Sequence, residues 1–360
     1  MSKLKKSQLE RTERLRSISS LLVETVPFTE ATDIIRRTYN NWHTRAEGTC
    51  AFVVGESGAG KTTVADDFLA MTARDLGTEY VAETSPDAHG RWGLIKETEN
   101  GFIRPVLKVF AAPTATRKGL LFDLLFALGI RAKKNSTETD LMALARRHLM
   151  AQQVKLLIFD ETHHIIDGHK KATAGEAAGL LKMLLIQPRV QIVCLGLPHT
   201  VEILTATEQL GRRCIAQYEI PPFRDNVHVP EGDFMHFCRA LERALPFDRK
   251  SGLDQPGMAL RLHGAGAGYV GRIVHITLTA AELAIDRGLP RVSAALLGEA
   301  YRDITTKQKN STQITDDINP FLIEEFRPDQ FAVIRARLEA QNADSTRQRG
   351  QKTPAPEFTK

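Results

Sequence analysis

The stretch that decides the fold runs from residue 55 to residue 62 and reads GESGAGKT. It matches the pattern G-x-x-x-x-G-K-[S/T] at each fixed position, with an apolar segment before it and a helix-forming run after it. Glycines let the backbone turn tightly, so that successive N–H groups face phosphate oxygens. A helix that begins at Lys61 points the positive end of its dipole at the same anions. The stretch therefore predicts a phosphate-binding loop between a strand and a helix.

We expect this loop to bind ATP with Mg²⁺. Lys61 provides the positive charge that faces the β and γ phosphates, and the Thr62 hydroxyl is a ligand for Mg²⁺. The residues predicted to contact the nucleotide are Gly55, Glu56, Ser57, Gly58, Ala59, Gly60, Lys61, Thr62 and Thr63.

A pair of carboxylates follows a second apolar run, LLIFDE at 156–161. At the end of a strand, Asp160 can hold Mg²⁺ through water, and Glu161 can polarise the attacking water. Two adjacent acids favour hydrolysis over nucleotide binding alone. Three histidines follow, at 163, 164 and 169, but no cysteine lies nearby. We expect these histidines on a helix surface or behind the site rather than around a protein-bound zinc.

Alternation of short apolar and helix-forming segments between 50 and 220 predicts a parallel α/β core. The runs at 155–159 and 191–195 are apolar almost throughout, as expected for strands that are covered by helices on both faces. The predicted strands are 50–54, 79–83, 103–110, 155–159, 191–195 and 215–220. The predicted helices are 61–74, 119–128, 138–152, 174–185 and 200–207. The polar, glycine-containing stretch between 85 and 104 predicts an inserted loop or hairpin.

Four regions are expected: an N-terminal helical extension (1–47), an α/β nucleotide-binding domain (48–220), a small helical lid domain (221–307) and a C-terminal extension with a partly disordered tail (308–360). The extension contains a helix at 8–16 and a second one after Pro27, with Thr29 as its N-cap. In the C-terminal extension a helix opens at Pro328 and runs to about residue 340. Phe321 and Phe326 either dock on a partner or strap the protein's own surface.

Composition sets broad limits on the class of protein. The 360 residues are 42% hydrophobic and 25% charged, which is the balance of a globular protein. The formal net charge of +5 permits a polyanionic partner without requiring one. The four cysteines form no C-x-x-C pair, and there is neither a signal core nor an apolar run long enough to cross a bilayer. We expect a cytoplasmic protein.

The segments QLGRRC (209–214) and GYVGRI (268–273) narrow the class. The first ends a helical stretch just before the last strand, where AAA+ ATPases carry an arginine finger that reaches the neighbouring subunit's nucleotide. By this resemblance Arg213 fits the finger best and Arg212 second. The second segment resembles the sensor-2 motif, in which Arg272 would reach the γ-phosphate.

From about residue 8 to residue 304 the chain resembles the TniB/TnsC family of transposition ATPases. The resemblance includes the loop GESGAGKTTVADDF, the stretch FDETHHIIDGH, the segment LLKMLLIQPRVQIVCLGLP, and both arginine segments. One position departs from the family. The strand that ends at 195–196 is usually followed by a threonine that acts as sensor 1, and here that position is Leu197. Either Thr200 or another group then takes its place, or hydrolysis is slow.

The resemblance implies an AAA+ ATPase that binds double-stranded DNA with ATP. Such proteins assemble as homo-oligomeric rings or helical filaments and recruit or activate a transposase, with a targeting adaptor as a further partner. It places ATP and Mg²⁺ between adjacent subunits, with Lys61, Asp160 and the catalytic Glu161 on one side and the arginine finger on the other. For DNA it points to the loops beside the second and third strands. Lysine and arginine side chains suit sequence-independent phosphate contacts. The candidates there are Arg117 and Lys118 first, then Arg104 and Lys96, with Arg91 behind them. Lys170 and Lys171, just after the acid pair, are another candidate.

Two other readings stay open on the sequence. The ATPase could serve secretion-pore assembly or helicase loading, although the chain shows no membrane span or wall-binding module. It could also be a signalling NTPase that gates a protein contact without DNA. Retention on duplex DNA that falls steeply with salt argues against the last reading.

Overall fold

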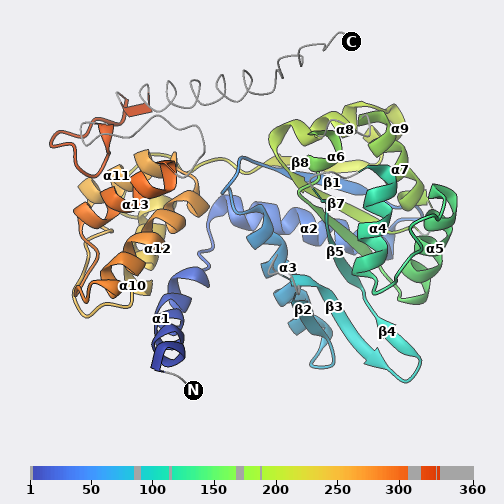
Figure 1. Ribbon diagram of the computed structural model, residues 1–360. Coiled ribbons are helices and arrows are strands. Elements are labelled where there is room, and N and C mark those ends of the chain that lie inside the picture. Colours follow the sequence, from blue (N-terminus) through green and yellow to red (C-terminus); the bar gives the residue numbers. More distant parts are fainter. Residues whose placement is uncertain are drawn as a thin grey trace, which may run out of the picture. The chain divides into compact units, whose positions relative to one another are not determined.

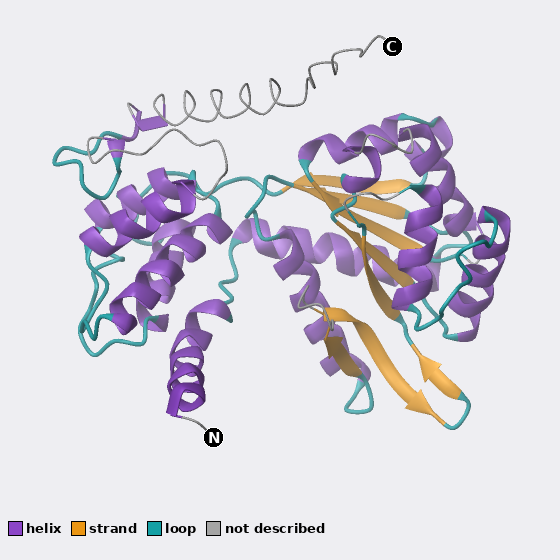
Figure 2. Ribbon diagram, in the orientation of Figure 1, coloured by secondary structure: helices purple, strands orange, loops and turns teal. Residues whose placement is uncertain are grey.

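The computed structural model of the chain describes residues 3–84, 91–112, 116–167, 174–186, 189–306, 318–329 and 331–332 (Figures 1 and 2). The chain divides into two compact units. Glu24–Pro221 forms an α/β unit, and Met1–Val23 together with Pro222–Lys360 forms a helical unit.

The α/β unit is built on one sheet, whose strands follow the order β2-β3-β5-β6-β7-β1-β8, with β4 paired to β3. Neighbours from β5 to β8 pair in parallel, whereas β3 runs antiparallel to β2, β4 and β5. The strands are β1 (Cys50–Val54), β2 (Val81–Thr84), β3 (Arg91–Thr98), β4 (Gly101–Ile103), β5 (Val106–Phe110), β6 (Leu156–Asp160), β7 (Gln191–Gly196) and β8 (Cys214–Glu219). The predicted parallel core is confirmed, and the interrupting stretch contains the antiparallel hairpin β3–β4.

Helices cover both faces of this sheet (Figure 2). On one face, alternate residues of β1 and β5 join a core cluster with α4 (Arg117–Ala127), α5 (Glu138–Ala151) and α7 (Ala174–Ile186). On the other face lie α2 (Val26–Thr44) and α3 (Lys61–Leu76), which contact each other and the central strands. Short helices α6 (His164–Asp167), η1 (Pro198–Val201), α8 (Glu202–Thr205) and α9 (Glu208–Gly211) complete the unit. Burial on both faces explains why β1, β6 and β7 are apolar runs.

The register of the parallel strands sets where functional groups lie. Val54 pairs with Gly196, Phe159 with Cys194, and Phe110 with Asp160, so the carboxyl ends of β1, β5, β6 and β7 meet at one edge. The loops that follow these four strands therefore share that edge, which is where open parallel sheets bind their ligands.

Several predicted boundaries are wrong for identifiable reasons. Helix α2 begins at Val26 with Thr25 as N-cap rather than at Thr29, because Pro27 is tolerated in the first turn, where its missing N–H is not needed. The predicted strand 103–110 is two strands, since Pro105 cannot donate to the ladder and Arg104 N–H bonds Gln152 O instead. The predicted helix 200–207 is a 3₁₀ turn followed by one short helix.

The helical unit packs α1 (Lys3–Ser19), α10 (Asp233–Ala244), α11 (Pro256–Gly266), α12 (Val270–Asp286) and α13 (Ala294–Thr306) around a second core. Leu15 and Ile18 place α1 in this core, and Arg11 pairs with Asp286 of α12. The extension that we predicted as one piece, 1–47, is thus divided: α1 belongs to the helical unit and α2 to the α/β unit. Amphipathic spacing alone does not show which body a helix packs against.

The described part of the C-terminal extension is a strap on the helical unit. Phe321 and Phe331 are 4% and 2% exposed and contact Tyr301, so they are core residues. Arg261 of α11 donates to three carbonyl oxygens of the strap, those of Pro320, Ile323 and Glu324. Phe326 contacts Phe331 and Arg261, so for Phe321 and Phe326 the strap over the protein's own surface is confirmed within 318–329 and 331–332. The predicted helix at Pro328 is present at 328–329 and 331–332, and its continuation lies outside the described residues.

None of the helices in the described ranges has the length and apolar character needed to span a bilayer. All four cysteines are free thiols, and three of them, Cys50, Cys194 and Cys238, are buried.

We predict that Arg261→Ala lowers the free energy of unfolding by about 2 kcal/mol, because hydrogen bonds from a charged donor to three carbonyls are lost. Chemical denaturation measures the loss, and limited proteolysis should cleave after residue 318 faster than in the wild type. Arg327→Ala is the control, since its exposed side chain pairs only loosely with Glu325. Equal stability of the two variants would contradict the role of the strap.

Candidate nucleotide-binding site

The phosphate-binding loop joins β1 to α3 as the sequence predicts. Gly55 N–H donates to Gly196 O at 3.1 Å, which fixes the loop to the end of β7. Gly58 and Gly60 have φ values of +86° and +95°, a region that favours glycine, and Gly60 is the N-cap of α3. The first turn of α3 therefore presents its free N–H groups at the carboxyl edge of the sheet, where phosphate oxygens can accept them.

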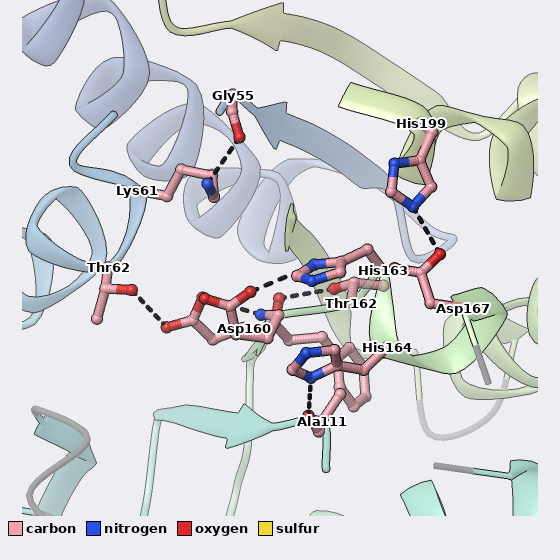
Figure 3. A network of polar contacts seen from close by, with 12 residues as sticks. Gly55, Lys61, Thr62, Ala111, Asp160, Thr162, His163, His164, Asp167 and His199 are labelled. Carbon is pink, nitrogen blue, oxygen red and sulfur yellow. Dashed lines mark hydrogen bonds and ion pairs between the residues drawn. The ribbon is translucent and has the colours of Figure 1, made fainter. Parts of the chain in front are cut away.

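Lys61 lies inside this loop with its ammonium group buried. The residue is 6% exposed, and Nζ donates to Gly55 O at 2.7 Å and to Glu56 O at 3.0 Å (Figure 3). Burial lowers the pKa of Lys61, against the opposing effect of nearby Glu161 and Asp160. A cation that is desolvated and bonded only to neutral carbonyls gains most when an anion enters the loop.

Thr62 and Asp160 connect the loop to the end of β6. The Thr62 hydroxyl donates to Asp160 Oδ2 at 2.9 Å. Burial raises the pKa of Asp160, which is 2% exposed, and the charge of Lys108 opposes that shift. Two oxygens on neighbouring corners of a Mg²⁺ octahedron lie about 2.9 Å apart. The hydroxyl and the carboxylate thus fit as direct or water-mediated ligands of the nucleotide's Mg²⁺.

Lys108 of β5 braces this side of the site. It is 3% exposed, and its Nζ lies 2.6 Å from Asp66 Oδ1 of α3. The pair ties the helix that follows the phosphate-binding loop to the strand beside Asp160. Sequence reasoning missed it, because a lysine in an apolar strand and an aspartate in a helix carry no shared pattern.

His163 and His164 lie beside Asp160 (Figure 3), and the side chain of Glu161 lies close to both histidines. Glu161 has φ +53° and its backbone N–H donates to Asp160 Oδ1 at 2.9 Å. Glu161 Oε2 lies 3.2 Å from His163 Nδ1, and His164 Nδ1 lies 2.9 Å from Ala111 O. Side chains on a helix surface were one of our expectations, but His163 is buried and adjoins the acid pair. His169 lies outside the described residues.

Glu161, His163 and His164 each offer a ligand atom within 4.8 Å of one another, so these three side chains could hold a metal ion. Mg²⁺ takes oxygen ligands and does not favour imidazole. The ion that accompanies a nucleotide therefore fits Thr62 and Asp160 better than the histidine cluster.

The two candidate finger arginines differ in accessibility. Arg213 is 18% exposed and pairs with Glu47 at 2.6 Å, whereas Arg212 is 76% exposed and pairs with Glu208 one helical turn away. Both precede β8, and Cys50 N–H donates to Arg213 O, which places them at the amino edge of the sheet, away from the phosphate-binding loop of the same chain. The sequence ranked Arg213 first, but the structure gives Arg212 the freer side chain.

Arg272 lies in the first turn of α12 and contacts the ring of Tyr269 at 4.8 Å. It belongs to the helical unit, so its role at a γ-phosphate stays a prediction.

The four predicted DNA-contacting cations are all engaged within the α/β unit. Arg104 is buried at 7% exposure and bonds Gln152, which makes it a structural residue and a poor candidate. Lys96 pairs with Glu79, and Arg117 pairs with Glu138. Lys118 Nζ donates to Lys134 O at 3.4 Å. Sequence reasoning missed the exposed cations Arg131, Lys133 and Lys134, which lie in the loop between α4 and α5. The run RAKK at 131–134 was the signal that could have found them.

A model of the family described as Bacterial TniB protein matches residues 22–224. The chain belongs to the TniB family. The match covers the phosphate-binding loop, the Asp160–Glu161 pair and the two candidate finger arginines of this TniB-family chain. A search of curated proteins finds no sequence match.

Solved structures share its fold at low sequence identity. The Aeropyrum pernix ORC2 protein in ADPNP-ADP complexes is 14% identical, with a TM-score of 0.55 over 84% of this chain and 75% of that one. Its ADP form is 15% identical over the same shares, also with a TM-score of 0.55. Cdc6p from Pyrobaculum aerophilum is 11% identical, with a TM-score of 0.54 over 83% of this chain and 71% of that one. The predicted fold, a P-loop α/β core with a mostly parallel sheet flanked by helices, is confirmed.

We predict that Lys61→Met abolishes the thermal stabilisation that MgATP gives the wild type. A ligand at 100 times its Kd stabilises the folded state by about 2.7 kcal/mol, and this gain requires the ammonium group. Without nucleotide the variant should melt at the wild-type temperature or above it, because the substitution removes a buried charge. Differential scanning fluorimetry measures both effects, with exposed Lys250→Met as the control. A normal MgATP shift in Lys61→Met would contradict the assignment.

Proposed function

We propose that this TniB-family chain hydrolyses ATP, assembles on double-stranded DNA in the ATP-bound state, and recruits or activates a transposase. The observation that carries the proposal is the convergence of Lys61, Thr62, Asp160 and Glu161 at one sheet edge, within the segment that matches the TniB family. The ATP site is inferred from the geometry of these four residues, whereas the transposition role is inferred from membership of the TniB family.

Each residue of the site has a defined task. The backbone N–H groups of the loop and Lys61 bind the phosphates and hold the γ-phosphate for in-line attack. Mg²⁺, when bound through Thr62 and Asp160, neutralises charge on the β and γ phosphates. Glu161 accepts the proton of the attacking water, since its carboxylate follows directly after Asp160. The buried surroundings strengthen these electrostatic contacts.

The position of the arginines supports assembly. Arg212 and Arg213 lie at the amino edge of the sheet, and the five residues of β1 separate that edge from the phosphate-binding loop. At about 3.3 Å per residue this distance exceeds the reach of an arginine side chain. A finger from this place therefore acts on the nucleotide of a neighbouring copy, which makes the oligomer sensitive to the γ-phosphate.

The DNA contact is supported by the cations around the N-termini of α4 and α5. Arg117 and Lys118 begin α4, and exposed Lys133 and Lys134 precede α5. Lys118 Nζ donates to the backbone carbonyl of Lys134, so the start of α4 lies beside the loop that carries Lys133 and Lys134. Such a cluster suits the phosphate backbone of DNA, and binding to it should weaken steeply with salt.

We predict DNA-bound oligomers with a non-hydrolysable ATP analogue and none with ADP, as seen by electron microscopy and by filter retention of duplex DNA. Glu161→Gln should bind ATP and remain assembled, because it cannot accept the proton of the attacking water. Retention should fall between low and moderate salt. Assembly that ignores the nucleotide, or a Glu161→Gln variant that does not assemble, would contradict the proposal.

The arginines give a separate prediction. Substituting alanine for the finger should lower ATP turnover by about 10³-fold or more, as the loss of an arginine finger does elsewhere, with monomer affinity for nucleotide unchanged. Arg212→Ala and Arg213→Ala are compared in turnover and in calorimetric binding. At least one of the two variants should lose turnover and keep its affinity for nucleotide. If both hydrolyse ATP at the wild-type rate, the proposal that an arginine of one copy acts on the nucleotide of the next is wrong.

A further inference from the structure

The carboxylate of Glu161 needs a group that fixes its direction. The bond from its backbone N–H to Asp160 Oδ1 fixes the main chain, but the side chain retains its own rotatable bonds. General-base catalysis requires the carboxylate to point at the attacking water. The side chain that approaches it is His163, whose Nδ1 lies 3.2 Å from Glu161 Oε2 (Figure 3).

His163 is itself held firmly from two strands. Thr162 N–H donates to Leu195 O at 2.8 Å, and the Thr162 hydroxyl donates to Phe159 O at 2.9 Å, so the preceding residue is fixed to β7 and β6. A Cβ at Gly196 would lie 3.2 Å from His163 N, which shows how closely the turn packs on β7. The ring contacts His164 at 4.3 Å between centroids, and His164 bonds Ala111 O at the end of β5.

The Nδ1 atom of His163 is available for a hydrogen bond to Glu161. It is 7% exposed, and its Nδ1 has no hydrogen-bond partner of proper geometry among the described residues. A buried polar nitrogen without a partner is costly, and a small rotation of the Glu161 carboxylate supplies one. Burial and neighbouring His164 lower the pKa of His163 to about 4, so the ring is neutral at pH 7 and can carry its proton on Nδ1.

Among the described residues, no polar group that follows β7 is hydrogen-bonded to Glu161. Leu197 stands where the sequence resemblance expects a threonine. The Thr200 hydroxyl, which we considered as its substitute, is buried against Gly196: a Cβ there would lie 2.3 Å from it. No hydrogen bond joins Thr200 Oγ1 to Glu161 in the described structure.

We propose that His163 is the positioning residue for Glu161: its Nδ1–H donates to one carboxylate oxygen and leaves the other directed at the attacking water. This inference rests on the proposed ATPase function. It gives His163, three residues after Asp160, the role of orienting Glu161. A polar residue after β7 would otherwise have that role.

The test separates positioning from structural support. His163→Ala should lower kcat about 10- to 100-fold, as the loss of an orienting partner does elsewhere, with the Kd for a non-hydrolysable MgATP analogue unchanged within twofold. His163→Asn should recover most of the rate, because its side-chain amide can donate from near the place of Nδ1. His199→Ala is the matched control. Its ring adjoins His163 at 5.9 Å and pairs with Asp167, and no contact joins it to Glu161 among the described residues.

A double variant tests whether the two residues act as one unit. Glu161→Gln combined with His163→Ala should hydrolyse ATP no more slowly than Glu161→Gln alone, because His163 acts only through the carboxylate. Additive losses overturn the inference, and so does a His163→Ala variant with wild-type kcat. A drop in thermal stability shared by His163→Ala and His163→Asn without recovery in the latter assigns a structural role and also overturns it. A wild type that does not hydrolyse ATP overturns the proposed function instead.

Discussion

The hydrogen bond between Thr62 and Asp160 is the contact on which the site depends. It joins residues 98 positions apart in the chain, and it can form only if β1 and β6 run parallel on either side of β7 with their carboxyl ends level. The same pairing brings Gly55 N–H to Gly196 O and sets the loop at the end of β7. Parallel register thus places the phosphate-binding and metal-binding groups together.

Burial disfavours the charged forms of the ionisable groups at this edge of the sheet. Burial lowers the pKa of Lys61 and raises that of Asp160, so each ionised form is disfavoured by its surroundings and supported by a few neighbours. Lys108 and Asp66 add a buried ion pair that holds α3 against β5. A nucleotide phosphate with Mg²⁺ supplies a partner for both Lys61 and Asp160. The structure is thus arranged to gain binding energy from a charged ligand rather than to stabilise itself.

Much of this could be predicted from local sequence. GESGAGKT and LLIFDE identified the loop, the acid pair and the Thr62 and Asp160 oxygens that we propose as metal ligands, and β1 begins and ends where the apolar run does. These features are local, because a glycine pattern and an apolar run act on their own backbone. Predictions that depended on contacts between residues far apart in the sequence were less accurate. Arg104 is covered by Gln152 and Glu83, Phe321 lies in the core of the helical unit, and α1 packs with α12 within that same unit. The approach of His163 to Glu161 likewise depends on how a turn packs against β7, which residue type and spacing do not encode.

The central claim is that one triphosphate binds per chain at the end of β1 through Lys61, Thr62 and Asp160. Isothermal titration calorimetry of the wild-type protein with a non-hydrolysable ATP analogue tests it most directly, in the presence of Mg²⁺ and again with the metal chelated. The account predicts one site per chain, with affinity that falls when Mg²⁺ is removed. An absence of binding heat, or binding indifferent to Mg²⁺, would contradict it.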